Sequence, residues 1–255
     1  MAKSENHLTI RECTSIDDLS KCVELQREAF ALPEIEISPV RHLVVTRSAG
    51  GFILGAFINT ELVGFVLSVP AYLKGQRAYY SHMTAVRSGH QSYGIGARLK
   101  WAQRERSLVE GVKYIKWTFE PVKARNAYFN LEKLGAIVRE YAEDYYGIDY
   151  DTSSEAGEAV GLASDRLFAE WELDSPKVVA LSEGKVFTHD ADPAATISIT
   201  NDWSTLVNED PKQALREQMR IRTEFTDAFS KRLVARAFLR ARDEMPPMYL
   251  LYEEQ

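Results

Sequence analysis

The segment Val86–Lys100, VRSGHQSYGIGARLK, constrains the fold most strongly, because it puts Gly94 and Gly96 where an extended pattern changes to a helical one. The preceding AYYSHMTAV is rich in aromatic and β-branched residues and predicts a strand, while Ile95 and Leu99 begin a helical repeat. Such a turn exposes consecutive backbone N–H groups, with no Cβ in the way, at the positive end of a helix dipole. The segment predicts either an anion site in an α/β fold or a tight turn whose glycines serve backbone geometry alone.

Two well-known phosphate-binding loops do not fit this turn. A dinucleotide-binding fingerprint needs a third glycine at the position of Leu99. A P-loop needs Gly-Lys followed by Ser or Thr, and the sequence has no such tripeptide. The turn therefore belongs to neither of these two classes of phosphate-binding loop.

The segments around the turn alternate between strand and helix patterns from residue 7 to residue 174. Ser15 is expected to cap a helix that Pro33 closes, and the helix after the glycine turn is expected to end at Gly111. A further helix is expected over residues 124–136, and strands over 7–13, 50–59, 61–73, 78–86, 114–121, 137–141 and 165–173. The acidic, tyrosine-rich stretch 141–161 has no period and predicts a long functional loop.

The pattern changes after residue 174, so we predict two domains, 1–174 and 175–255. In the second, strands are expected at residues 177–183, 195–200, 232–241 and 248–254, and a helix at 210–229. This part is too apolar for a disordered tail, so it is expected to form an α/β subdomain or a homodimer element.

Charge and composition exclude several classes of protein. The net charge is −6, from 31 Lys and Arg against 37 Asp and Glu, which argues against nucleic acid as a partner. The longest apolar runs fall far short of the roughly 20 residues that span a bilayer, and the start lacks the core of a signal peptide, so a cytoplasmic protein without membrane partners is expected. Cys13 and Cys22 have no metal-binding spacing and are expected to be buried free thiols.

The turn does resemble one family. Gln91–Gly96, QSYGIG, is similar to the Q/R-x-x-G-x-G/A signature of the GNAT superfamily of acyl-CoA-dependent N-acyltransferases, and LEKLGA at Leu131–Ala136 is similar to its later Y-E-K-L-G-F pattern. The sequences SHMTAV and WTFEPVKARNAYFNLEKLGA also resemble those of a bacterial branch of this superfamily that is linked to N-succinylamino acid racemases. Some members of that branch acylate D-amino acids from succinyl-CoA. The resemblance implies a mixed, twisted sheet flanked by helices, and transfer of an acetyl or succinyl group from acyl-CoA.

The same resemblance implies which residues hold the acyl-CoA. Backbone N–H groups from Gln91 through Ala97 would bind the pyrophosphate, the strand HMTAV would pair with pantetheine, and Asn126 would approach from the later helix. N–H groups near Thr84 and Ala85 would polarise the thioester carbonyl. The expected cofactor-binding residues are Thr84, Ala85, Val86, Gln91, Ser92, Tyr93, Gly94, Ile95, Gly96, Ala97 and Asn126, with no metal.

The chemistry needs a base for the amine and a proton for the leaving thiolate. His82 and Glu120 are the candidate bases; alternatively, His82 is a core histidine and Glu120 is a capping or ion-paired carboxylate. Many members of the superfamily carry a tyrosine acid where this chain has Leu131. Tyr128 could substitute if it is not a packing residue, and water is the other source of the proton.

The acceptor is expected to be a small-molecule amine, such as an amino acid. Arg166 could bind a substrate carboxylate, or could pair with Asp165 or Glu170 instead. Tyr145 could line the acceptor side or lie in a surface loop. Two rival functions stay open. One is an acyl-CoA-binding module without catalysis, which the leucine at position 131 in place of a tyrosine acid would favour. The other is a protein N-acetyltransferase.

Overall fold

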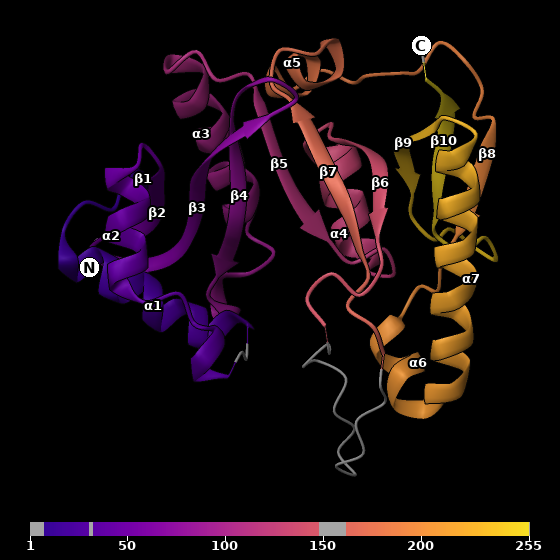
Figure 1. The fold of residues 1–255 in the computed structure, drawn as a ribbon, viewed down its shortest axis with the longest axis horizontal. Coiled ribbons are helices and arrows are strands. Elements are labelled where there is room, and N and C mark those ends of the chain that lie inside the picture. The colour runs from indigo at the N-terminus through magenta and orange to yellow at the C-terminus, as the bar shows by residue number, and fades with distance from the viewer. Residues whose placement is uncertain (1–7, 31–32, 148–161, 255) are drawn as a thin grey trace, which may run out of the picture. The chain divides into compact units, whose positions relative to one another are not determined.

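A computed structural model describes residues 8–30, 33–147 and 162–254 (Figure 1). The chain divides into two compact units, Met1–Lys116 and Trp117–Gln255. The predicted boundary between residues 174 and 175 was drawn from a change in the sequence pattern, and it stays a prediction.

The first unit is built on antiparallel strands in the spatial order β1, β2, β3, β4. They are β1 (Leu8–Glu12), β2 (Phe52–Ile58), β3 (Glu61–Leu73) and β4 (Gln76–Val86). Two-residue turns join β2 to β3 and β3 to β4, and the second of these, Lys74-Gly75, has both φ angles positive (51° and 74°), as hairpin turns favour. The start of β5 (Tyr114–Phe119) pairs with β4 in parallel, Tyr79 opposite Ile115 and Tyr80 opposite Lys116.

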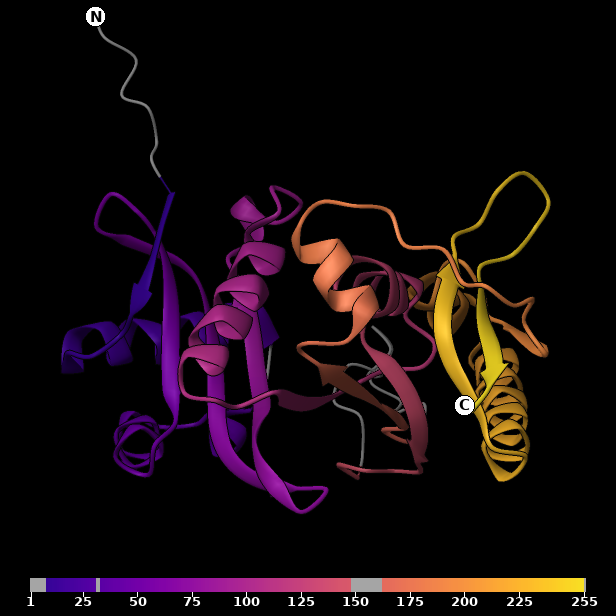
Figure 2. The ribbon, with the colours of Figure 1, turned by 90° about the horizontal axis from the view of Figure 1, so that it is seen from above.

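Helices cover both faces of this first sheet (Figure 2). On one face, α1 (Ile16–Phe30) and α2 (Val40–Ser48) share a core with Phe65 and Leu67 of β3. The other face receives α3 (Ile95–Val109), whose Ile95 and Leu99 lie against Gly64, where an added Cβ would come within 3.3 Å of both side chains. The short helical turns η1 (Glu34–Glu36) and η2 (Ser88–His90) complete the unit.

Several local predictions for the first unit are confirmed. The Ser15 hydroxyl accepts a hydrogen bond from the Asp18 N–H at 3.1 Å at the start of α1. Gly111 adopts a left-handed φ of 72° just after α3. Cys13 and Cys22 are fully buried free thiols. The strand and helix alternation expected here is therefore present with its caps.

The second unit has its own antiparallel ladder in the order β7, β6, β9, β10, β8. These strands are β6 (Ile137–Ala142), β7 (Arg166–Glu172), β8 (Ala195–Ser198), β9 (Leu233–Leu239) and β10 (Met248–Glu253). The helices are α4 (Ala124–Tyr128) with a π-helical continuation, η3 (Phe129–Lys133), then α5 (Pro176–Ser182), α6 (Trp203–Glu209) and α7 (Pro211–Ser230). Val138 of β6 pairs with Ala235 of β9, so the late strands extend the ladder of the earlier ones.

One prediction for the late segment is wrong, and one helix there was not predicted. Residues 177–183 were expected to be a strand, but the chain forms α5 there. Pro176 at the first helical position favours a helix, and Val178 and Leu181 pack on one side against Gly135, so tertiary packing overrides the strand preference of the paired valines. The sequence also gave no warning of α6, which Asp202 caps by accepting the Thr205 N–H at 3.0 Å.

Candidate functional site

A bulge in β4 marks the part of the first unit where the predicted site residues gather. Leu67 lies opposite Met83 and Ser68 lies opposite Ser81, so His82 is an extra residue with no partner in β3. Bulges of this kind redirect side chains and are frequent beside active sites. The expected residues Thr84, Ala85 and Val86 come directly after it, up to the end of the strand.

The glycine turn leads from the end of β4 into α3. Ser92 and Gly94 both have left-handed φ angles, 69° and 76°, and Gly94 is the N-terminal cap of the helix. The first N–H that donates within the helix is that of Arg98, to the Gly94 carbonyl at 3.0 Å. The N–H groups of the three residues before it, Ile95, Gly96 and Ala97, therefore have no acceptor inside the helix.

The turn leaves the space that an anion needs. A Cβ built on Gly94 would meet no atom within 4 Å, and one built on Gly96 would meet only Val86, at 3.9 Å. At Gly94 the left-handed φ of 76° by itself favours glycine. At Gly96 neither a positive φ nor a close neighbour requires glycine, whereas a ligand approaching the backbone would. The residues of the turn fit a pyrophosphate by this test.

Two polar side chains of the turn, Arg87 and Gln91, are already occupied. Arg87 pairs with Glu28 at 3.3 Å and also with Glu61. The Gln91 amide donates back to the Val86 carbonyl at 3.3 Å. Anion binding at this turn would therefore depend mainly on backbone N–H groups.

His82 is an exposed side chain, although the protein atoms around it still reduce its hydration. That loss of hydration, with a smaller contribution from His42, lowers the pKa of His82. The two imidazole rings are 6.5 Å apart, nearly perpendicular. An imidazole with a lowered pKa is neutral at pH 7 and can accept a proton.

In the second unit, a small pocket brings the predicted residues Glu120 and Arg166 together. Its volume is about 10 Å³, room for about one water-sized group. The lining residues are Glu120, Pro121, Val122, Leu162, Ala163, Asp165, Arg166, Trp203 and Gln218. Trp203 and Gln218 come from α6 and α7, more than 80 residues after Glu120.

The carboxylates of Asp165 and Glu170, the expected ion-pair partners of Arg166, pair with other arginines. Asp165 is buried and binds Arg222 through both carboxylate oxygens, at 2.8 and 3.0 Å, and Glu170 pairs with Arg139. Arg166 instead donates to the backbone carbonyl of Asp165 and lies over the Tyr146 ring. The Glu120 carboxylate has an ion pair with Lys123 at 3.4 Å, in line with the ion-paired alternative for that residue.

Gln218 is a pocket residue that the sequence did not reveal. It is 5% exposed, and its Nε2 donates to the Ala163 carbonyl at 2.7 Å. Its Oε1 is buried and has no hydrogen-bond partner among the described residues. A buried acceptor without a donor is costly, which suggests that a ligand or a water supplies one.

The remaining predicted residues lie on or near α4 and β6. Tyr128 is half-buried, with Arg240 at 4.4 Å from the centre of its ring, and Leu131 is fully buried core. Asn126 is exposed. Tyr145 packs edge-on against Tyr146 and Phe168, and residues 148–161 of the predicted loop lie outside the described residues.

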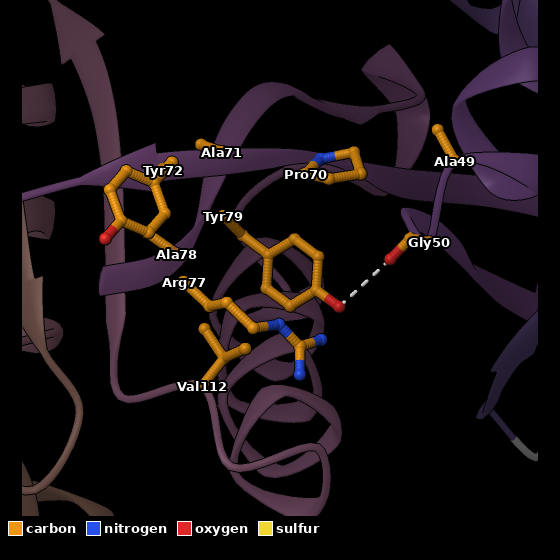
Figure 3. Close-up of a pocket in the computed structure, with 9 residues that line it drawn as sticks. All are labelled: Ala49, Gly50, Pro70, Ala71, Tyr72, Arg77, Ala78, Tyr79 and Val112. Atoms are coloured by element: carbon orange, nitrogen blue, oxygen red, sulfur yellow. Dashed lines mark hydrogen bonds between the residues drawn. The ribbon is translucent and has the colours of Figure 1, made fainter. Parts of the chain in front are cut away.

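A second pocket, of about 300 Å³, lies in the first unit (Figure 3). It surrounds Tyr79, whose hydroxyl donates to the Gly50 carbonyl at 3.1 Å. None of the predicted site residues lines it. In the described part of the chain, no group of His, Cys, Asp or Glu could hold a metal ion, and no helix is long and apolar enough to span a membrane.

Comparison with known proteins identifies the pattern around the glycine turn. Residues 16–136 match the model of the acetyltransferase (GNAT) family, a stretch that contains the bulge, the turn and α4. A comparison with curated proteins gives no match.

Solved structures agree with this on the fold. The ribosomal-protein-S18-alanine N-acetyltransferase of Escherichia coli has a TM-score of 0.52 and 14% identity, over 72% of this chain and 99% of that one. The ribosomal-protein-alanine N-acetyltransferase of Brucella melitensis has a TM-score of 0.51 and 19% identity, over 65% of this chain and 99% of that one. A GNAT-family acetyltransferase of Streptococcus pneumoniae has a TM-score of 0.50 and 16% identity, over 64% of this chain and 98% of that one. The fold is that of the GNAT acetyltransferases, with a substantial extra part that these proteins lack.

Proposed function

Because residues 16–136 match the acetyltransferase (GNAT) family and the fold is the GNAT fold, we propose that this protein is an acyl-CoA-dependent N-acyltransferase. The observation that carries the proposal is the glycine turn. It offers three N–H groups at the start of α3 without acceptors inside the helix, beside Gly94 and Gly96, where the space that a Cβ would take is open. That combination suits a pyrophosphate.

Acyl-CoA would supply the activated thioester. Its pyrophosphate would bind to backbone N–H groups of Gln91, Ser92, Tyr93, Gly94, Ile95, Gly96 and Ala97. Asn126 is the further cofactor-binding residue that the family resemblance implies. The end of β4 would bind its pantetheine arm as an added strand does, and N–H groups at Thr84 and Ala85 would stabilise the developing negative charge on the carbonyl oxygen.

The acceptor amine would attack the thioester directly. The new N–C bond replaces the C–S bond, and the proton lost by the amine balances the one gained by the thiolate. His82 is the favoured base, because its lowered pKa keeps it neutral at pH 7; Glu120 is the second candidate. Tyr128 or water would protonate the thiolate, since Leu131 cannot.

The acceptor would be a small primary amine, such as an amino acid. The pocket around Glu120 has room for about one water-sized group, which is the size of an amine nitrogen. The buried Oε1 of Gln218 can accept one of its N–H groups, and Arg166 can bind a carboxylate. Acylation of D-amino acids from succinyl-CoA, as in the bacterial branch that the sequence resembles, is included in this proposal.

The test is thiol release from acetyl-CoA and succinyl-CoA with a panel of L- and D-amino acids, polyamines and peptides with N-terminal alanine. We expect turnover with a small amine, lost in His82→Ala while coenzyme A still binds. Turnover with peptides alone would point to a protein N-acetyltransferase. Coenzyme A binding without turnover on any acceptor would refute the catalytic proposal in favour of a binding module.

A further inference from the structure

We infer that Gln103, together with Ser68 and Ser81, is a positioning unit that holds the β4 bulge in register for acyl transfer. The inference rests on the proposed function for its catalytic consequence, and on contacts within the first unit for its geometry. Neither the family match nor the structural likenesses assign a role to these three side chains.

The two serines form the pair that closes the bulge. Ser68 and Ser81 are opposite one another, and the next opposite pair, Leu67 and Met83, already has the extra residue His82 between it and the serines. Val66 lies opposite Thr84 in the same ladder. Because Val66 and Ser68 share one face of β3, Ser81 and Thr84 must share that face too, although they are three positions apart.

Gln103 of α3 binds both serines at once. Its Nε2 donates to the Ser68 hydroxyl at 2.7 Å and to the Ser81 hydroxyl at 3.1 Å. The Ser81 hydroxyl also donates to Gln103 Oε1 at 3.3 Å and accepts from Lys100 Nζ at 3.0 Å. One helix side chain thus connects β3 and β4 at the point where their register changes.

The network is almost wholly removed from solvent. Ser68 and Gln103 are 0% exposed, Lys100 is 2% exposed and Ser81 is 6% exposed. Burial also lowers the pKa of Lys100 well below its ordinary value. A buried polar group costs free energy unless it is bonded, so a single arrangement that satisfies these groups is strongly preferred over neighbouring ones.

The register matters because the residues after the bulge are those proposed to act at the thioester. They are Thr84 and Ala85, and the extra residue His82 is the proposed base. Moving the extra residue by one position along β4 would turn the residues between the old and new positions to the opposite face. The helix that carries Gln103 begins directly after Gly94, so the network connects the bulge to the proposed pyrophosphate site by a rigid element.

The test uses Gln103→Met, which keeps the length of the side chain and removes its hydrogen bonds, and Ser68→Ala as a milder variant. Ser107→Ala is the matched control: Ser107 is equally buried on α3, but its hydroxyl donates to the Gln103 backbone carbonyl at 2.7 Å rather than to either strand. We expect kcat to fall at least tenfold in Gln103→Met, with the Kd for coenzyme A changed less than threefold. Ser107→Ala should keep the kcat of the parent.

Amide hydrogen exchange gives a readout that needs no turnover. In Gln103→Met and Ser68→Ala, exchange at residues 81–85 should accelerate at least tenfold, while exchange in β2 stays the same. Unchanged exchange in both variants, or an equal acceleration in Ser107→Ala, would overturn the inference. If the parent protein shows no acyl transfer, the proposed function fails, but exchange still decides whether Gln103 holds the bulge.

Discussion

Replacing Gly94 by alanine separates the anion-binding role of the turn from its backbone role, because the chain contains a matched control. Gly94 and Gly111 stand at opposite ends of α3, with φ angles of 76° and 72°. A Cβ at either position would meet no atom within 4 Å. Gly94→Ala and Gly111→Ala therefore impose the same left-handed strain without a clash.

The stability cost should be nearly equal in the two variants. An alanine in the left-handed region costs about 1–2 kcal/mol. For a chain of 255 residues, each kcal/mol lowers Tm by roughly 2–4 °C, so both variants should lose about 2–8 °C. Differential scanning calorimetry checks this part.

Affinity for coenzyme A should distinguish them. Only the Cβ at position 94 would stand in the proposed phosphate site, and losing one hydrogen bond to a charged group costs about 1.5–3 kcal/mol, roughly 10- to 100-fold in Kd. Titration calorimetry with coenzyme A should show that loss in Gly94→Ala and an unchanged Kd in Gly111→Ala. Equal affinity in all three proteins would refute the assignment of the turn.

Three further predictions concern the other parts of the site. With saturating amine, the acid limb of kcat should lie below pH 6.5, since the pKa of His82 is lowered and the base acts once the pH exceeds that value. A limb of kcat above pH 7 would argue against His82 as the base. Arg222→Met should lower the free energy of unfolding in urea by about 3 kcal/mol, because it leaves the buried Asp165 carboxylate without its cation. An unchanged unfolding midpoint would show that Asp165 does not need the Arg222 cation. Gln218→Leu should raise KM for the amine at least tenfold with an unchanged Kd for coenzyme A, and equal effects on both ligands would argue against a specific contact.

The glycine turn could be predicted from sequence because its signal is local. Two glycines at the change from strand to helix pattern have few other uses, and Gly94 is indeed the cap of α3. The bulge at His82 could not, since an extra residue in a strand leaves the alternation on each side intact. It is visible only once Ser68 and Ser81 are seen to be opposite.

The pocket in the second unit was half predictable. Glu120 and Arg166 come from the chemistry expected of residues 1–174, but Trp203 and Gln218 belong to the later segment, where the sequence pattern predicted no site residue. Their positions depend on the packing of α6 and α7, and nothing in seven residues such as Trp203–Glu209 gives a periodic signal. The error at α5 has a similar cause, because contacts with Gly135 decide the conformation there.

The position of Leu131 bears on which group protonates the leaving thiolate. That side chain is fully buried in η3, so its position belongs to the core in this chain and could hold no acid without rebuilding the packing. Tyr128, one turn earlier, has its ring against the guanidinium of Arg240, a contact that a packing role explains by itself. A thiol with a pKa near 8.5 leaves without full protonation, so we expect water to serve as the proton source. We therefore expect Tyr128→Phe to keep most of the parent kcat in the thiol-release assay, and a loss of a hundredfold or more would instead establish Tyr128 as the acid.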